Sequence, residues 1–536
     1  MKKSNSILKL VPYLVLFLVV VSVSSCSSND APTPDPVIQP VPPVVVVPGF
    51  PGPSYLDNYT SISSWGSNSQ WNLANVHDPS VEKCGDYYYM YQTDASYGNA
   101  TEGHGHFFYR RSKDLVNWEF MGSSMTTAPA WVKDSLNNKR ARMVPALPAI
   151  QNPSYGYWAP CVRKVGAKYR MYYSIVVTEP IVGTDYNTSW SERAFIGLAE
   201  TDDLASNVWT DKGMVVCSEP DGIKSYVRNG GNDWEAYFKF NAIDPSFVST
   251  PEGDQYLIYG SWHSGIAALK LNPITGKPNQ LKTLSDYGVK IASRGNSRWQ
   301  ASEGPEIIYN AVTGYYYLFM AYDELSVAYN TRVARSKSIT GPYIGIDGGN
   351  VTTGAECWPM VTHPYAFNYH TGWVGISHCA IFQNPDTKEW FYSSQARLPE
   401  GVPGINVSNA IMMGHIRAIQ WTEDGWPVIA PERYAAVPKT TITEASFIGS
   451  WEQITMNYQY KTIQKSVTIY LTADKKVSGG STGTWSYDST NEVLTVNGNK
   501  CKVSDAWDWE SATRKVTITY SGLTPGGLPV WGKKIN

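Results

Sequence analysis

Short runs of aromatic and branched apolar residues recur along this chain, and turn residues separate them. Five runs are especially rich in aromatic side chains: Asp86–Thr93, Lys168–Ile175, Gln255–Trp262, Tyr315–Tyr322 and Glu389–Ala396. Apolar runs of this length, bounded by Gly, Pro and Asn, predict buried β-strands. Most are followed by a second strand-like segment, and few stretches have a helical period, so the chain is expected to be all-β.

The five runs belong to a repeated unit of about 60 to 90 residues. Several short strands per unit with Gly and Pro turns predict the radial blades of a propeller. We therefore expect a five-bladed β-propeller over residues 54–438. In that architecture the innermost strand of each blade lines a central channel, and the aromatic strand packs beside it.

The composition changes after Pro438, where Thr, Ser, Lys and Val become frequent. Segments that alternate apolar and polar residues follow: Ser466–Thr472, Gly483–Tyr487, Glu492–Val496 and Lys515–Tyr520. This pattern predicts a separate, small antiparallel β-barrel or sandwich domain over residues 444–536.

The N-terminus has the pattern of a targeting segment. A basic start precedes the mostly apolar run Leu10–Val21, which is short for a membrane span, and small residues lead to Cys26. Residues 1–25 resemble a bacterial lipoprotein signal peptide, with an ordinary secreted protein as the alternative. The Pro- and Val-rich residues 26–53 then form a tether. We expect a cell-envelope protein held to the membrane by a lipid on Cys26.

Charge and cysteine usage exclude other classes. The net charge is -2, and without a basic stripe a nucleic-acid partner is not expected. The cysteines beyond Cys26 are widely spaced, without the spacing of a metal site. The 20 Trp and 36 Tyr residues mostly suit a β core, although such rings also stack on sugars. The protein is expected to be a monomer.

Chemistry-bearing residues open short motifs ahead of the aromatic runs. The acidic motifs are His77-Asp78-Pro79-Ser80, Ile243-Asp244-Pro245-Ser246 and Ser302-Glu303-Gly304-Pro305, and the other two units carry Trp158-Ala159-Pro160 and Ser377-His378-Cys379. If the repeats close around an axis, these positions converge. An Asp before Pro is expected to be extended.

Three carboxyl groups at one point suit the hydrolysis of glycosidic bonds, which needs a carboxylic acid and a second carboxylate. Asp78 and Glu303 are the candidates for these two roles. Like charges and desolvation raise at least one pKa in such a cluster. Glu303 is expected to be the protonated member, with Asp244 orienting it and tuning its pKa. His378 could bind a metal, hold a water or contact the substrate.

From about residue 70 to 435 the chain resembles glycoside hydrolase family 43, and within it the arabinanase branch. The resemblance rests on motifs in a fixed order: Val76–Ser80, Tyr157–Pro160, Asn241–Ser246, Tyr259–Ile266, Ser302–Pro305 and Tyr329–Tyr343. The family implies an inverting reaction with Asp78 as general base, Glu303 as general acid and Asp244 as the tuning residue. Inversion places the base and acid about 6.5–9.5 Å apart.

The resemblance also implies calcium or a similar, largely hydrated cation next to His378. Ser261 and Trp262 would lie in the loop along the sugar subsite, and Trp158 is a further substrate-binding candidate. Two departures from the family pattern lie near the channel. Cys161 stands where an Asp is common, and Gly375-Ile376-Ser377-His378 replaces the usual Gly-x-Gly-His. The C-terminal region resembles the small lipocalin-like barrel of some arabinanases.

The expected function is endo-acting hydrolysis of α-1,5-L-arabinofuranosidic bonds in pectic arabinan. Exo-arabinanase, α-L-arabinofuranosidase and β-xylosidase activities stay open within the family. A non-catalytic glycan-binding propeller is a different reading, against which the retention of all three carboxylates argues. A metal-dependent hydrolase centred on His378 is a third reading, but His378 lacks neighbours at ligand spacing.

Overall fold

A computed structural model of the chain describes residues 49–55, 57, 59–94, 102–144, 146–178, 192–220, 238–294, 302–367 and 370–535. The predicted signal peptide and Cys26 lie outside these residues. Among the helices of the described part, none is long and apolar enough to cross a membrane.

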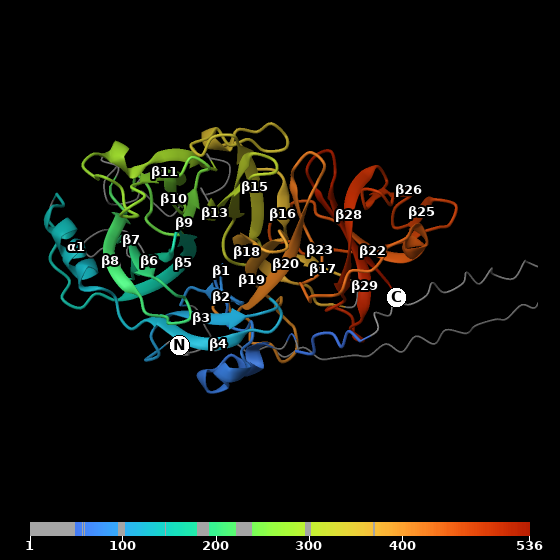
Figure 1. Cartoon of the computed structure of the whole chain (residues 1–536), viewed down its shortest axis with the longest axis horizontal. Helices are drawn as coiled ribbons and strands as arrows, with labels where there is room; N and C mark the ends of the chain where they lie inside the picture. Colours follow the sequence, from blue (N-terminus) through green and yellow to red (C-terminus); the bar gives the residue numbers. More distant parts are fainter. Residues whose placement is uncertain are drawn as a thin grey trace, which may run out of the picture. The chain divides into compact units, whose positions relative to one another are not determined.

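Five four-stranded antiparallel sheets follow one another in chain order (Figure 1), and each is a meander of consecutive strands. The strands are, sheet by sheet, β1 (Ser80–Cys84), β2 (Tyr87–Tyr91), β3 (His106–Ser112) and β4 (Glu119–Met125); β5 (Tyr155–Val165), β6 (Lys168–Val177), β7 (Ala194–Thr201) and β8 (Thr210–Cys217); β9 (Ser246–Ser249), β10 (Gln255–Tyr259), β11 (Ile266–Leu271) and β12 (Val289–Ala292); β13 (Ser302–Asn310), β14 (Tyr315–Tyr322), β15 (Asn330–Ser336) and β16 (Met360–Thr362); β18 (Val374–Gln383), β19 (Trp390–Arg397), β20 (Met413–Trp421) and β21 (Pro427–Ile429). The predicted five-bladed propeller is confirmed.

In the residues that the structure describes, helical structure is confined to the connections. The α-helix α1 (Ala130–Ala141) lies between the first two sheets and was not predicted. The 3-10 turns are η1 (Tyr59–Ile62), η2 (Trp65–Gln70), η3 (Leu284–Tyr287), η4 (Val351–Thr353) and η5 (Glu444–Phe447).

The aromatic runs form the second strand of each blade, paired with the first strand as expected. In β6 and β14, every residue but the first is buried. Because blades stack face to face, the second strand of a blade has a neighbouring sheet on both of its faces. Both faces are therefore apolar, and the strand is a continuous apolar run instead of an alternation of apolar and polar residues. Separate apolar clusters join the first sheet to the second, the second to the third and the third to the fourth.

The last and first blades share an apolar cluster too, and a backbone contact joins them in addition. Residues 73–76, just ahead of β1, run beside β20 of the fifth blade. Ala74 forms a β-bridge with Met413, and the Gly414 amide donates to the Leu73 carbonyl at 2.7 Å. The segment ahead of Asp78 is therefore fixed to the fifth blade.

The C-terminal strands form a closed barrel, drawn in orange to red in Figure 1. Its strands are β22 (Gly449–Thr455), β24 (Val467–Leu471), β25 (Lys476–Gly479), β26 (Gly483–Asp488), β27 (Val493–Val496), β28 (Asn499–Trp507), β29 (Val516–Leu523) and β30 (Pro529–Lys534). Side chains such as Phe447, Trp451 and Tyr520 fill its interior.

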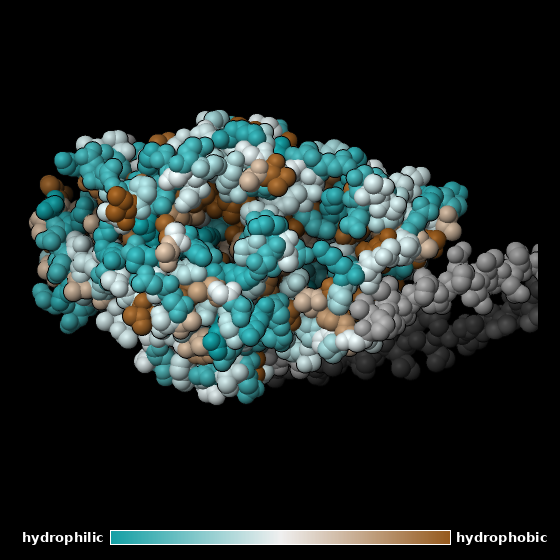
Figure 2. Space-filling model, viewed as in Figure 1, coloured by the Kyte–Doolittle hydropathy of each residue, from teal (hydrophilic) through white to brown (hydrophobic). Residues whose placement is uncertain are grey.

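The barrel is joined to the propeller by backbone and side chains. The short strands β17 (Tyr365–Ala366) and β23 (Gln464–Lys465) pair in parallel, and the buried Tyr365 hydroxyl donates to Glu510 at 2.6 Å. The face shown in Figure 2 is largely polar, with apolar residues in small separate patches.

Candidate active site

One residue with a left-handed backbone lies at the same place in every blade, where the chain reaches the channel. These residues are Asp78 (φ 43°), Ala159 (φ 43°), Asp244 (φ 56°), Gly304 (φ 53°) and His378 (φ 50°). The prediction of an extended Asp78 and Asp244 is therefore wrong. In three of the five blades the innermost strand bulges here, and a bulge breaks the alternation of side chains and re-aims one of them.

Glu303 is displaced by one residue from this position, which Gly304 occupies in its blade. The three acids are thus not in strict register. A Cβ added to Gly304 would lie 2.9–3.1 Å from ring atoms of His378. Glycine is required there both for its backbone conformation and for the close approach of the imidazole ring.

Asp78 is held from three sides. His378 Nδ1 lies 2.9 Å from Asp78 Oδ1, and the Thr93 hydroxyl donates to Oδ2 at 2.5 Å. The Asp78 amide donates to Gln395 Oε1 at 2.5 Å, which fixes the backbone as well. Each of these partners comes from a strand or strand end of the first or fifth blade.

Glu303 accepts hydrogen bonds on both carboxyl oxygens. Trp262 Nε1 donates to Oε2 at 2.5 Å, and the Ser261 hydroxyl donates to the same atom at 3.3 Å. The hydroxyl of Tyr329, a buried residue, donates to Oε1 at 2.5 Å. Ser261 and Trp262, predicted as substrate-binding residues, therefore contact Glu303 directly.

Asp244 is buried and accepts a hydrogen bond from the Gly304 amide, at 3.1 Å from Oδ2. This contact links the third blade to the residue that follows Glu303. Asp244 can thus orient Glu303 through the backbone, and its own charge can act through space on the protonation of Glu303.

The environments of Asp78 and Glu303 move their pKa values in opposite directions. Burial acts to raise the pKa of Asp78, but the positive charge and hydrogen bond of His378 outweigh it, so the pKa lies below its ordinary value. Burial raises the pKa of Glu303, and the donors Tyr329 and Trp262 and the charge of His378 offset this only in part. Two carboxyl groups separated in this way can serve as a base and an acid.

Asp244 and His378 complete the charge pattern. Burial, together with the nearby Glu303 and Asp78, raises the pKa of Asp244 to about 7, although His378 acts against this rise. Burial acts to lower the pKa of His378, but the charges of Asp78 and Asp244 outweigh it and raise the pKa to about 10. His378 is thus a cation at neutral pH.

A buried ion pair lies farther along the channel, and sequence reasoning did not find it. Arg163 on β5 pairs with Glu306 on β13, and Arg163 Nη1 donates to the Ser80 hydroxyl of the first blade at 3.2 Å. Glu306 also accepts from the Ser246 hydroxyl of the third blade at 2.6 Å and from the Ile381 amide of the fifth blade at 3.1 Å. This channel network (Ser80, Arg163, Ser246, Glu306 and Ile381) joins all five blades.

Two of the residues singled out from the sequence lie beside the carboxyl cluster rather than in it. Trp158 is half-buried and packs against Val176, Ala194 and Ile243. Cys161 is a free, buried thiol that lines the channel cavity, and burial raises its pKa to about 11. A neutral thiol is a poor substitute for the carboxylate that is common there in the family.

Metal ligands are few around His378. Across the described ranges, no three His, Cys, Asp or Glu side chains are grouped so that they could hold a metal ion. The channel cavity next to His378 has a volume of about 20 Å³ and is also lined by the cationic Arg163. Calcium prefers six to eight oxygen ligands, so these residues do not fit a calcium ion held mainly by protein.

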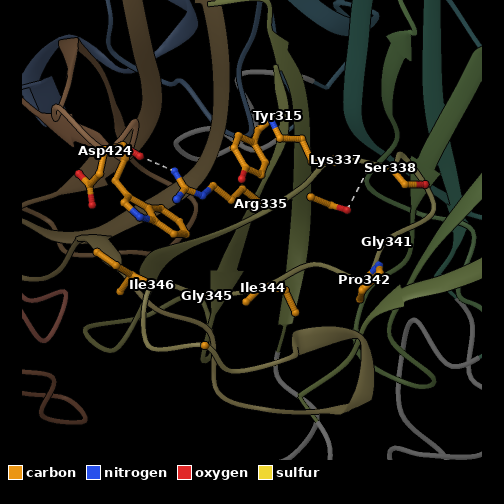
Figure 3. A pocket seen from close by; sticks show the side chains of 13 residues that line it. Tyr315, Arg335, Lys337, Ser338, Gly341, Pro342, Ile344, Gly345, Ile346 and Asp424 are labelled. Carbon is orange, nitrogen blue, oxygen red and sulfur yellow. Dashed lines mark hydrogen bonds between the residues drawn. The ribbon is translucent and has the colours of Figure 1, made fainter. Parts of the chain in front are cut away.

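A larger hollow lies on the fourth and fifth blades and shares no residue with the carboxyl cluster (Figure 3). Its volume is about 640 Å³. The Arg335 guanidinium lies over the rings of Tyr315 and Trp426, at 4.6 and 4.2 Å from their centres, and Lys337 also covers Tyr315. These rings are therefore already covered by cations.

Comparison with known proteins agrees with this geometry. A profile described as "Glycosyl hydrolases family 43" matches residues 73–427, and one described as "C-terminal lipocalin-like domain" matches residues 431–532. The "Extracellular endo-alpha-(1->5)-L-arabinanase 2" of Bacillus subtilis is 26% identical over 482 residues, which cover 86% of this chain and 93% of that protein. The "Extracellular endo-alpha-(1->5)-L-arabinanase" of Thermotoga petrophila is 26% identical over 491 residues, which cover 86% and 94%.

The solved structures agree as well. The crystal structure of an endo-1,5-alpha-L-arabinanase from Thermotoga petrophila superposes with a TM-score of 0.65 at 25% identity. The superposition covers 87% of this chain and 99% of that one. The resemblance drawn from the sequence motifs is confirmed.

Proposed function

Because the chain belongs to glycosyl hydrolase family 43, we propose that it hydrolyses the α-1,5-L-arabinofuranosidic bonds of arabinan by internal cleavage. In one cluster of carboxyl groups, the pKa of Asp78 lies below its ordinary value and the pKa of Glu303 lies above it. This difference is the observation that carries the proposal. The names of the relatives above support the substrate and the endo action. A glycan-binding propeller would have no use for a buried carboxyl group with a raised pKa.

The reaction follows from the contacts of each group. Asp78, ionised beside His378, accepts a proton from a water molecule, whose oxygen forms the new bond to the anomeric carbon. Glu303 Oε2 already accepts two hydrogen bonds and Oε1 only the one from Tyr329, so we assign the acid proton to Oε1. Glu303 gives this proton to the leaving oxygen as the glycosidic bond breaks, and the configuration inverts. Asp244 orients Glu303 through the Gly304 amide.

The test is digestion of linear arabinan by the full chain and by two isosteric variants, Asp78→Asn and Glu303→Gln. Wild type should release oligosaccharides of mixed length early in the reaction. Each variant should lose at least about 10²-fold in kcat, the scale of general acid–base catalysis. Early release of single sugars only would favour an exo-acting enzyme, and unchanged rates in both variants would refute the assignment.

Calcium is a secondary part of the proposal. We propose that a calcium ion, when bound, takes one ligand from His378 Nε2 and the remainder from water, since Nδ1 is paired with Asp78. The imidazolium would have to release its Nε2 proton to solvent before this atom could hold the ion. When bound, such an ion adds positive charge near the base. Equilibrium dialysis with calcium should detect binding to wild type and a loss in His378→Gln; equal binding would place the ion elsewhere.

The location is likewise proposed. The relatives are described as extracellular, and the N-terminal motif supports a monomer held in the cell envelope by a lipid on Cys26. Exposed apolar side chains such as Val144, Ile274 and Val312 are scattered singly, which supports the monomer. Labelled palmitate should be incorporated into wild type and not into Cys26→Ala, and sedimentation should give the mass of one chain.

A further inference from the structure

The C-terminal barrel contacts the loop that carries Tyr329, the hydroxyl donor to Glu303. This active-site loop (residues 323–329) connects β14 to β15. It lies at the same end of the fourth blade as Glu303, because Ser302 pairs with Tyr322 and Glu303 with Ala321. The barrel loop (residues 456–463) connects β22 to β23 and reaches this end of the blade.

Three side-chain contacts join the two loops. The Tyr458 hydroxyl donates to Asp323 Oδ2 at 2.8 Å, and the Tyr460 hydroxyl donates to Glu324 Oε1 at 2.6 Å. Lys461 Nζ lies 3.1 Å from the same Glu324 oxygen. The Tyr458 ring also lies under the guanidinium of Arg332, 4.6 Å from its centre.

Asp323 is the point where the active-site loop begins, and its conformation needs support. It is fully buried and has a left-handed backbone with φ 69°. For a residue other than glycine this conformation is strained and persists only when its surroundings hold it. Arg294 pairs with Oδ1 at 2.7 Å, while Asn330 and Tyr458 donate to Oδ2 at 2.9 and 2.8 Å.

Asn330 directly follows Tyr329 in the chain. The contacts of Asp323 therefore fix both ends of the loop, and Tyr329 lies at one of them with its hydroxyl 2.5 Å from Glu303 Oε1. Oε1 is also the oxygen assigned above to carry the acid proton. A shift of the loop would change the hydrogen bond at that atom.

We propose that Tyr458 of the C-terminal barrel is a positioning residue for the general acid, acting through Asp323 and Tyr329 on Glu303. The barrel is thus part of the catalytic unit and not only an appended domain. This inference rests on the proposed function, because it assigns Glu303 the role of acid.

The test compares two substrates with wild type and Tyr458→Phe in the full chain. Tyr458→Phe removes one oxygen and keeps the ring under Arg332. On linear arabinan, whose leaving oxygen needs a proton, kcat should fall about tenfold, a part of the general-acid contribution, with an unchanged KM. On an arabino-oligosaccharide with a 2,4-dinitrophenolate leaving group, which needs no proton, kcat should stay within about twofold for the same reason.

Tyr470→Phe is the matched control, because Tyr470 lies on β24 of the same barrel and is itself 46% exposed. It should behave as wild type on both substrates. Tyr460→Phe with Lys461→Ala loosens the same loop from its exposed side and should reproduce the selective loss if Tyr458→Phe gives too little folded protein.

The outcomes distinguish the positioning role of Tyr458 from the proposed hydrolase activity. Equal losses on both substrates, or no loss on arabinan, would overturn the positioning role. A wild-type enzyme that cleaves neither substrate would instead overturn the proposed function.

Discussion

Asp244 has the most costly environment of the three carboxyl groups. It is buried beside two other acids, and its pKa of about 7 lies well above the ordinary value near 3.8. A raised pKa means that the folded state binds the proton more tightly than the unfolded state. The stabilisation is complete below the unfolded pKa and is lost as the pH rises through the folded pKa. Catalytic use of Asp244 thus conflicts with stability above neutral pH.

Asp244→Asn should remove this conflict. An asparagine cannot ionise, and its side-chain oxygen can still accept from the Gly304 amide. At pH 8 the variant should be more stable than wild type, by on the order of 4 kcal/mol. At pH 4, where Asp244 is protonated in the folded state, the two should unfold alike. Urea unfolding at both pH values measures the difference.

Asp386→Asn is the control, because the Asp386 side chain is 72% exposed and its replacement should matter little at either pH. The activity of Asp244→Asn should fall, as Glu303 loses its charged neighbour. A variant that is no more stable than wild type at pH 8 would contradict the raised pKa.

The local architecture of the site consists of one left-handed residue in each blade. The acidic motifs and the blade repeat could be predicted from the sequence, because strand patterning and the order of the motifs carry that information. The left-handed conformation of Asp78 and Asp244 could not, because it depends on how each inner strand approaches the axis. The offset of Glu303, in contrast, can be read from the motifs once their prolines are aligned, because Asp78 and Asp244 directly precede a proline whereas Gly304 separates Glu303 from Pro305.

The hydrogen-bond partners of the acids could not be identified from the sequence either. Gln395 lies in the fifth blade and reaches Asp78 only because the ring closes. Thr93 and Tyr329 lie in the same blades as the acids that they contact, but on other strand ends or loops. Tyr329 does lie within a motif that carried the family resemblance, but nothing in a single sequence pairs it with Glu303.

Gly304→Ala tests the local packing. Its methyl group would lie about 3 Å from the His378 ring on a backbone that L-residues rarely adopt. The ring should move, the ion pair with Asp78 should weaken, and kcat should fall by about 10-fold or more, as expected when a catalytic group is displaced by a fraction of an ångström.

Gly314→Ala is the matched control, in the turn of the same β13–β14 hairpin with a similar φ of 65°. The atom nearest to its added methyl group is the flexible end of Lys337, at 3.2 Å. It carries the same backbone penalty without touching the site. Equal activity losses in both variants would show that backbone strain, and not contact with His378, is responsible.

No blade is completed by strands from both ends of the described chain, so closure of the ring depends on side chains in addition to the short backbone contact of residues 73–76 with the fifth blade. The channel network joins all five blades around Arg163 and Glu306. These residues have side chains only 16% and 5% exposed. Removing one partner of a buried ion pair leaves an uncompensated charge.

Arg163→Met should therefore destabilise the propeller by about 3–5 kcal/mol, seen as a lower urea midpoint. Lys270→Ala, which breaks an exposed pair with Asp254, should cost only about 0–1 kcal/mol. The double variant Arg163→Met with Glu306→Leu replaces both partners by apolar residues and should recover part of the stability lost in Arg163→Met. Equal midpoints for Arg163→Met and Lys270→Ala would contradict a closing role for the network.

The central claim is that Asp78 and Glu303 are chemically unequal, one activating water and the other protonating the leaving oxygen. Proton NMR of the first anomer released from linear arabino-oligosaccharides, recorded before mutarotation, tests it most directly. Attack by water on the face opposite the leaving group predicts that the new reducing end appears first as the β-anomer. Initial release of the α-anomer would mean retention, with Asp78 as a nucleophile, and would contradict the account.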